Sequence, residues 1–137
     1  MLQIKKRRDS ARAMRLMCTI VFYQDARHEK PLHWIRAVLG IGYLSRRNDG
    51  MSELRINGFR QVRDILSDVL PYIRFKKVQA TALLKAATLL SETAFKMMTR
   101  RKLELLARCI DVIQKDNYAT RYKKSLSEIR KLLGLTP

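Results

Sequence analysis

Residues 41–57 read IGYLSRRNDGMSELRIN, and this stretch decides the fold. Its two runs, 41–47 and 51–57, flank Asn48-Asp49-Gly50, a turn sequence, and together they predict an antiparallel hairpin. Strand alternation gathers polar side chains of these runs on one face: Tyr43, Ser45, Arg47, Glu53 and Arg55. That face is too polar for a core, and its many hydrogen-bonding groups indicate a binding surface. A solvated sheet face is the alternative interpretation.

The first 24 residues predict a second hairpin. One strand covers 2–8, the other covers 13–24, and Asp9-Ser10-Ala11 lies at the turn. The second strand alternates strictly, so one of its faces belongs to the core: Met14, Leu16, Cys18, Ile20 and Phe22. Its other face carries Arg15, Met17, Thr19, Val21 and Tyr23.

Each hairpin precedes an amphipathic helix, and the chain is helical from Lys77 onward. The first helix begins near Pro31, ends at Gly40 and is expected to pack Trp34 in the core. Ser125 and Glu128 form a candidate capping box for the last helix. The other expected helices cover 59–70, 78–98 and 103–113.

This order of elements, ββαββα, predicts an α+β fold. We expect a four-stranded antiparallel saddle sheet with helices on one face and a helical C-terminal part. Because no Gly-, Ser- or Pro-rich linker interrupts the sequence, we expect a single nucleic-acid-binding domain. Residues 1–76 form its sheet part and residues 77–137 form its helical part.

The charge of the chain points to a polyanionic partner. There are 29 Lys and Arg residues against 12 Asp and Glu, which gives a net charge of +17 and a pI near 10.6. The positive electrostatic field of such a chain attracts nucleic acid, because Lys and Arg that neutralise phosphates release the bound counterions. No run approaches the roughly 20 apolar residues that span a bilayer, and no secretory signal is visible. Nucleic acid is therefore the predicted partner rather than a membrane.

Other kinds of site find little support. Cys18 and Cys109 are far apart, and we expect two buried thiols in a reducing intracellular compartment, either bacterial cytoplasm or an organelle. His28 and His33 have no Cys or acid at ligand spacing, so no zinc site is expected. With five glycines, the chain lacks a Gly-rich phosphate loop.

Three stretches resemble one known family. They are FYQDARHEKPLHWIRAVLGIGYL at 22–44, LPYIRFKKVQATALL at 70–84 and NYATRYKKSLSEIRKLL at 117–133. With the order of elements, they are similar to LAGLIDADG homing endonucleases, in the single-motif, homodimer-forming group from introns of organellar ribosomal RNA genes. The resemblance covers residues 2–133, and PYIRFKKVQA at 71–80 is its most specific part.

The resemblance implies DNA binding by the sheet. Its contacting residues would be Gln3, Lys5, Arg7, Arg15, Met17, Thr19, Tyr43, Ser45, Arg47, Glu53 and Arg55. Cations near the first turn suit phosphate contacts: Lys6, Arg8 and Arg12. Gln24 and Lys76 match two residues that support cleavage in the family by organising water around the metals and the scissile phosphate.

The sequence departs from the family at the metal site. The family's acidic motif lies on a helix before the first strand, whereas the first strand here begins at Leu2 and no DGDG-like run occurs. Hydrolysis with Mg²⁺ needs carboxylates that hold the metal. We therefore expect no bound metal, an incomplete catalytic site and no homodimer through that helix. Mg²⁺ would bind only if the helix were supplied.

Three explanations fit this departure. In the first, a repurposed member binds nucleic acid without cutting it, with ribosomal RNA in a ribosome as a natural target. In the second, the chain is a fragment or split half of an active rDNA endonuclease. In the third, it is an unrelated basic DNA-binding domain.

Overall fold

The structure is a computed structural model that describes residues 1–6, 14–117 and 121–135. It divides into two compact units, one made by the strands and first helix up to Gly58 and one made by the helices from Phe59 onward. The sequence places the boundary between sheet and helical parts at 76/77, and whether the units form one domain stays a prediction.

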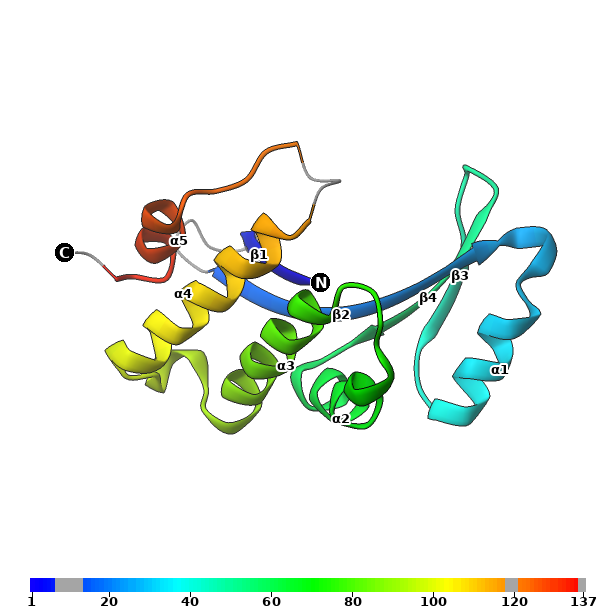
Figure 1. The fold of residues 1–137 in the computed structure, drawn as a ribbon, viewed down its shortest axis with the longest axis horizontal. Helices are drawn as coiled ribbons and strands as arrows, with labels where there is room; N and C mark the ends of the chain where they lie inside the picture. The colour runs from blue at the N-terminus through cyan, green and yellow to red at the C-terminus, as the bar shows by residue number, and fades with distance from the viewer. Residues whose placement is uncertain (7–13, 118–120, 136–137) are drawn as a thin grey trace. The chain divides into compact units, whose positions relative to one another are not determined.

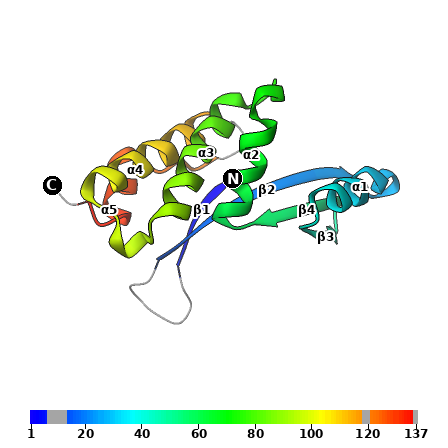
Figure 2. The same ribbon diagram turned by 90° about the horizontal axis from the view of Figure 1, so that it is seen from below.

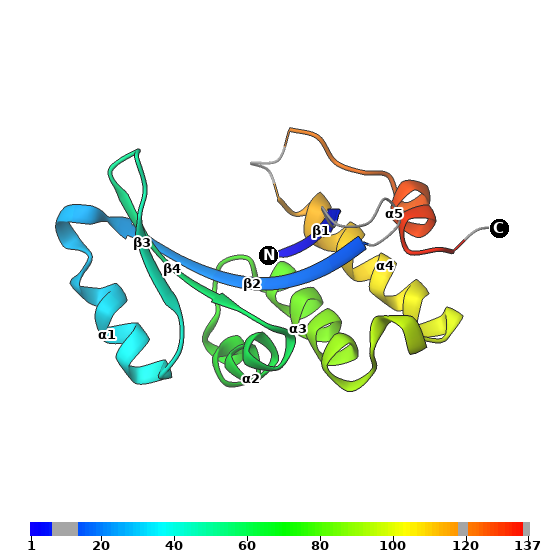
Figure 3. The ribbon, with the colours of Figure 1, turned by 180° about the vertical axis from the view of Figure 1, so that it is seen from behind.

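The first unit contains a four-stranded sheet. Its strands are β1 (Leu2–Lys6), β2 (Met14–Asp25), β3 (Tyr43–Arg46) and β4 (Met51–Asn57), in the order β1-β2-β4-β3. β4 pairs antiparallel with both β2 and β3, and β2 is the long curved strand of Figures 1 and 3. The hairpin of β3 and β4 is present, and β1 lies beside β2, but the predicted turn at Asp9-Ser10-Ala11 lies outside the described residues. The predicted α+β fold with a four-stranded sheet is confirmed.

The register assigns the two faces of the sheet. Across β2 and β4, Ile20 lies opposite Ile56 and Phe22 opposite Leu54. Leu54 and Ile56 are at most 1% exposed, because this apolar face forms the core of the sheet unit. The intervening residues point to the other face, which agrees with the alternation expected from the sequence.

One helix, α1 (Lys30–Leu39), belongs to the sheet unit and contacts β2 and β4. Pro31 lies in its first turn and Gly40 ends it with a φ of 68°, as the sequence predicts. Leu32 is 2% exposed, but Trp34 is 67% exposed. The expectation of a core tryptophan is therefore wrong, because two residues turn the helix by about 200° and carry Trp34 away from the side of Leu32.

Gly42 sets the start of β3. Its φ of 118° lies in a region that favours glycine, and a Cβ there would stand 2.6 Å from Leu54 Cδ1. The first strand of this hairpin thus begins at Tyr43 rather than at Ile41. The turn ends at Gly50, whose φ is 79°.

The second unit is a helical array. α3 (Lys77–Glu92) packs against α2 (Phe59–Val69) and α4 (Arg100–Lys115), and α5 (Leu126–Leu132) packs against α4, as Figure 2 shows. Ala82, Ala86 and Ala87 are buried on α3, where small side chains allow close packing of helices. Short 3₁₀ turns complete the chain: η1 (Ala26–His28), η2 (Leu70–Tyr72) and η3 (Phe95–Met97).

Two helix ends show how far local sequence predicts where a helix begins or ends. The capping box at Ser125 is confirmed, since its hydroxyl accepts from Glu128 N and the Glu128 carboxylate accepts from Ser125 N. The long helix expected over 78–98 ends at Glu92, because Thr93 is extended, with φ −133° and ψ 126°. Within the described ranges, no helix is long and apolar enough to cross a membrane.

Candidate nucleic-acid interface

The polar face of the sheet is called the arginine face here. Its members are Arg15, Met17, Thr19, Val21 and Tyr23 on β2, Tyr43 and Ser45 on β3, Arg47 just after β3, and Glu53, Arg55 and Asn57 on β4. The register brings three strands together, since Arg55 lies between Val21 and Tyr43, and Glu53 lies between Tyr23 and Ser45. Residues from both predicted hairpins thus share one surface.

Glu53 lies at the centre of this face and is 7% exposed. Arg55 Nη2 donates to its Oε1 at 2.8 Å, Ser45 Oγ donates to the same oxygen at 3.5 Å, and Arg47 Nη1 lies 4.0 Å from Oε2. A buried carboxylate needs such partners, because its desolvation is costly. Glu53 therefore positions two arginines, while its own depth leaves little surface for contact with a ligand.

The two arginines remain accessible. The side chain of Arg47 is 46% exposed and that of Arg55 is 38% exposed. Asp49 holds a second nitrogen of Arg47 at 2.9 Å, and the guanidinium lies over the Tyr23 ring at 5.6 Å from its centroid. The guanidinium groups are thus preorganised before any ligand arrives, which lowers the entropy cost of binding.

The outer part of β2 is less polar. Thr19 is 3% exposed and its hydroxyl donates to Asn57 Oδ1 at 2.8 Å, so both side chains already have partners. Arg15 is exposed, and Met17 and Val21 are half-buried. Tyr43, opposite Arg55 on the edge strand, is 70% exposed. The strongest hydrogen-bonding capacity therefore lies at the hairpin of β3 and β4.

Several predicted contacts stay predictions. Gln3, Lys5 and Lys6 belong to β1, but their side chains lie outside the described part of the chain. Arg7, Arg8 and Arg12 lie outside the described residues altogether.

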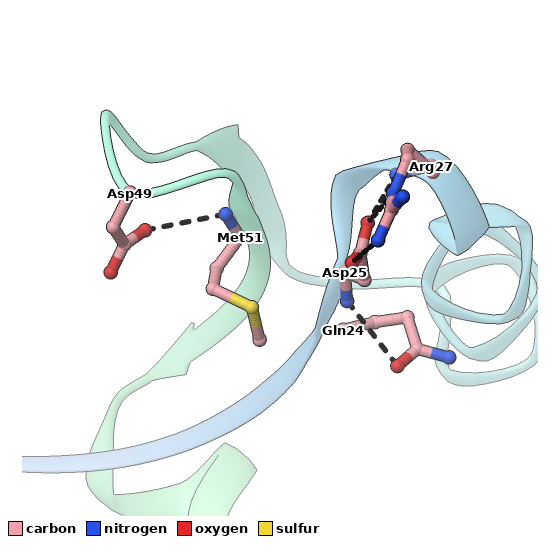
Figure 4. A network of polar contacts seen from close by, with 5 residues as sticks. All are labelled: Gln24, Asp25, Arg27, Asp49 and Met51. Atoms are coloured by element: carbon pink, nitrogen blue, oxygen red, sulfur yellow. Dashed lines mark hydrogen bonds and ion pairs between the residues drawn. The ribbon is translucent and has the colours of Figure 1, made fainter.

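The two residues matched to cleavage support lie elsewhere. Gln24 is the second-last residue of β2 and lies opposite Ser52, on the apolar side of the sheet. Its side-chain carbonyl accepts from Asp25 N at 3.3 Å. Gln24 and Asp25 leave the strand in opposite directions (Figure 4), and Asp25 is held by Arg27 at 2.8 Å. Lys76 is exposed just before α3 in the helical unit, with a φ of 57°. Gln24 is therefore not part of the arginine face.

A second polar cluster, which the sequence did not predict, is centred on Glu29 at the start of α1. Its carboxylate accepts from Arg46 Nη2 at 2.7 Å and Nε at 3.1 Å and from Ser52 Oγ at 2.5 Å, and His33 Nε2 lies 3.6 Å away. Bonds from Arg46 and then Ser52 lower the pKa of Glu29 to about 2. No sequence spacing joins these residues, so only the fold brings them together.

The described residues contain no group of three or more His, Cys, Asp or Glu side chains that could hold a metal ion. Cys18 and Cys109 are free and buried, as expected, and burial raises the pKa of Cys18 to about 12.

Comparisons with known proteins identify relatives of this arrangement, although no protein-family profile matches. The chain is 31% identical to the DNA endonuclease I-CvuI of Chlorella vulgaris over 91 residues, which are 66% of this chain and 56% of that protein. The match thus spans little more than half the length of this relative.

Solved structures share the fold. The archaeal intron-encoded homing endonuclease I-Vdi141I, complexed with DNA, gives a TM-score of 0.75 at 19% identity and covers 97% of this chain and 84% of its own. The LAGLIDADG homing endonuclease I-SmaMI, bound to cleaved DNA, gives 0.74 at 17% identity, with coverages of 100% and 45%. Sequence and fold together agree with the resemblance described above. The chain is thus similar in sequence to one DNA endonuclease and in fold to LAGLIDADG homing endonucleases.

Proposed function

We propose that this chain binds double-stranded DNA through the arginine face. The observation that carries the proposal is the Glu53 network, in which a buried carboxylate holds two half-exposed arginines on an antiparallel sheet. An antiparallel ribbon fits the major groove of B-DNA, and arginine is the commonest reader of guanine there. The net charge of +17 would supply the nonspecific part of the affinity.

The nature of the relatives favours DNA over RNA. I-Vdi141I is a complex with DNA and I-SmaMI is bound to cleaved DNA, whereas ribosomal RNA or a ribosome has no support among these comparisons. The face also suits a duplex, because Tyr23 and Tyr43 alone supply its rings and single-strand binding usually needs more stacking surfaces. Ribosomal RNA is the competing target.

We further propose that the chain alone binds DNA without cutting it. Metal-assisted hydrolysis of a phosphodiester requires carboxylates that hold Mg²⁺ against the phosphate, and the sequence has no DGDG-like run. The second candidate function is that of a fragment or split half of an active endonuclease. The similarity to these endonucleases favours this alternative equally.

The test begins by selecting bound duplexes from a random pool and measuring their Kd over a range of salt concentrations. Arg47→Gln and Arg55→Gln should each weaken the selected duplex by about 10-fold to 100-fold, which is the cost of a lost base contact. Arg60→Gln, an exposed change on α2, should cost less than about threefold. Equal losses in all three variants would refute reading by the arginine face.

Two further arms separate the alternatives. Ribosomal RNA fragments that bind more tightly than the selected duplex at equal salt would replace DNA as the target. Site-specific cleavage of a plasmid carrying the selected site, with Mg²⁺ and this chain alone, would establish the endonuclease instead. An intact plasmid that is nevertheless bound would support binding without cleavage.

A further inference from the structure

An open groove runs between α3 and α4 in the helical unit. Its floor holds Ala82 and Cys109, which are 7% and 8% exposed, and its volume is about 600 Å³. Three apolar side chains stand exposed along it, since Val78 is 58%, Leu105 47% and Val112 37% exposed. Neither helix covers these three side chains, so the groove presents apolar surface to solvent.

The two walls have matching lengths. Val78, Ala82 and Lys85 follow one another at helical spacing on α3, as Leu105, Cys109 and Val112 do on α4. Each wall therefore covers two helical turns, or about 10 Å. A seam of this length between two packed helices accepts the ridge of a third helix.

The charge around the groove selects the occupant. Lys77, Lys85 and Arg108 line it, and no Asp or Glu does among its described lining residues. A neighbouring hollow shares Leu105 and Arg108 and adds three arginines against a single carboxylate, that of Glu104. Arg108 already has Glu104 at 3.9 Å, so the lining carries an excess of positive charge rather than only unpaired cations. An apolar ridge with acidic flanks complements this excess, whereas a basic helix would be repelled by it.

We propose that this groove docks an acidic amphipathic helix of a protein partner. Such a helix places two or three apolar side chains over Ala82 and Cys109 at i, i+3 or i+4, and i+7, and its Asp and Glu side chains meet Lys77, Lys85 and Arg108. The groove shares no residue with the arginine face. Docking is therefore a separate property from DNA binding and does not depend on it.

The experiment uses the full chain and a synthetic labelled helix of about 16 residues with leucines on one face and glutamates beside them. A second peptide has the same composition and charge, but its leucines are spread around the helix. We expect the first peptide to bind at least about 10-fold more tightly in fluorescence anisotropy at 150 mM salt, because only it can fill the groove.

Variants locate the site. Leu105→Glu and Arg108→Glu should each lower the affinity for the first peptide by about 10-fold. Met97→Glu and Lys96→Glu make the same kinds of change outside the groove and should alter this affinity less than about twofold. Arg108 is an exposed side chain, so its variant tests the groove even if Leu105→Glu does not fold. Arg108→Glu and Lys96→Glu should bind the selected duplex with equal affinity. A loss of peptide binding can therefore be told apart from a loss of DNA binding.

Three results would overturn the proposal. Equal binding of the two peptides would show attraction by charge alone, and equal losses in groove and control variants would place the peptide elsewhere. Anionic phosphatidylserine vesicles that bind tightly and lose affinity with Leu105→Glu, but not with Met97→Glu, would assign the groove to a membrane surface. Amide-exchange protection of α3 and α4 by the first peptide would support docking.

Discussion

Replacement of Glu53 by Gln tests whether this carboxylate organises the arginine face. The change keeps the shape of the side chain and removes its charge, so Arg55 loses a charge-assisted bond of 2.8 Å. Such bonds contribute about 1.5–3 kcal/mol when shielded from water. The side chain of Arg55 is 38% exposed, so we reduce the expected loss of stability to about 1 kcal/mol.

The same variant should bind nonspecific DNA more tightly. A guanidinium between two anions holds a phosphate roughly 7 Å from the carboxylate, and Coulomb repulsion in water at that distance is about 0.6 kcal/mol. Removing the carboxylate charge should therefore raise the affinity for a random duplex about threefold. Discrimination in favour of the selected duplex should fall, because Arg47 and Arg55 lose the group that orients them.

The assays are thermal unfolding and fluorescence anisotropy with random and selected duplexes. We expect Tm to fall by about 3–5 °C in Glu53→Gln, given about 1 kcal/mol in a chain of this size. Glu92→Gln is the matched control, since it makes the same change in net charge at an exposed position. If both variants shift Tm and the ratio of selected to random affinity equally, Glu53 has no organising role and the reasoning fails.

Three further predictions concern stability. The pKa of Glu29 is about 2 in the folded protein and about 4.5 in its reference state, so the carboxylate stabilises the fold above about pH 4.5, and this stabilisation is lost as the pH falls toward 2. Glu29→Gln should therefore flatten the pH dependence of the free energy of urea unfolding between pH 4.5 and 2, and an unchanged dependence would contradict the prediction. Gly42→Ala should lower the free energy of unfolding by about 2 kcal/mol or more and Gly50→Ala by about 1 kcal/mol, because only Gly42 combines a positive φ with a clash for an added Cβ. Thermal unfolding that ranks the two variants in the opposite order would be inconsistent with the fold. Ser125→Ala should lower the stability of α5 by about 1 kcal/mol, because it removes the N-cap of that helix. Amide exchange in α5 should become faster, and unchanged exchange would show that the cap is dispensable.

The sequence predicts features that repeat locally. Alternation along 14–25 assigns the faces of β2, because the side-chain period of a strand is two and one face is buried. Gly40 as a helix end and the capping box at Ser125 are also readable, since backbone conformation and hydrogen bonding within a few residues determine them. These features account for the correct α+β assignment.

Features that depend on what covers a residue could not be predicted. Helical spacing turns Trp34 away from Leu32, but only the packing of α1 on its strands determines that the ring is left 67% exposed. The depth of Glu53 likewise comes from two other strands, which place Tyr23 and Ser45 beside it. Alternation assigns Glu53 to the polar face correctly, yet it gives no sign that this residue lies beneath its neighbours.

Strand register connects the two polar clusters. Ser52 and Glu53 are neighbours on β4 that point to opposite faces, one to Glu29 and the other to Arg47 and Arg55. A slip of one residue in β4 would exchange them and take the carboxylate away from the arginines. The bonds of Glu29 to Arg46 and Ser52 join α1, β3 and β4 in one register and oppose that slip. The Glu29 cluster therefore holds the arginine face in order from the opposite side of the sheet, although it lies outside that face.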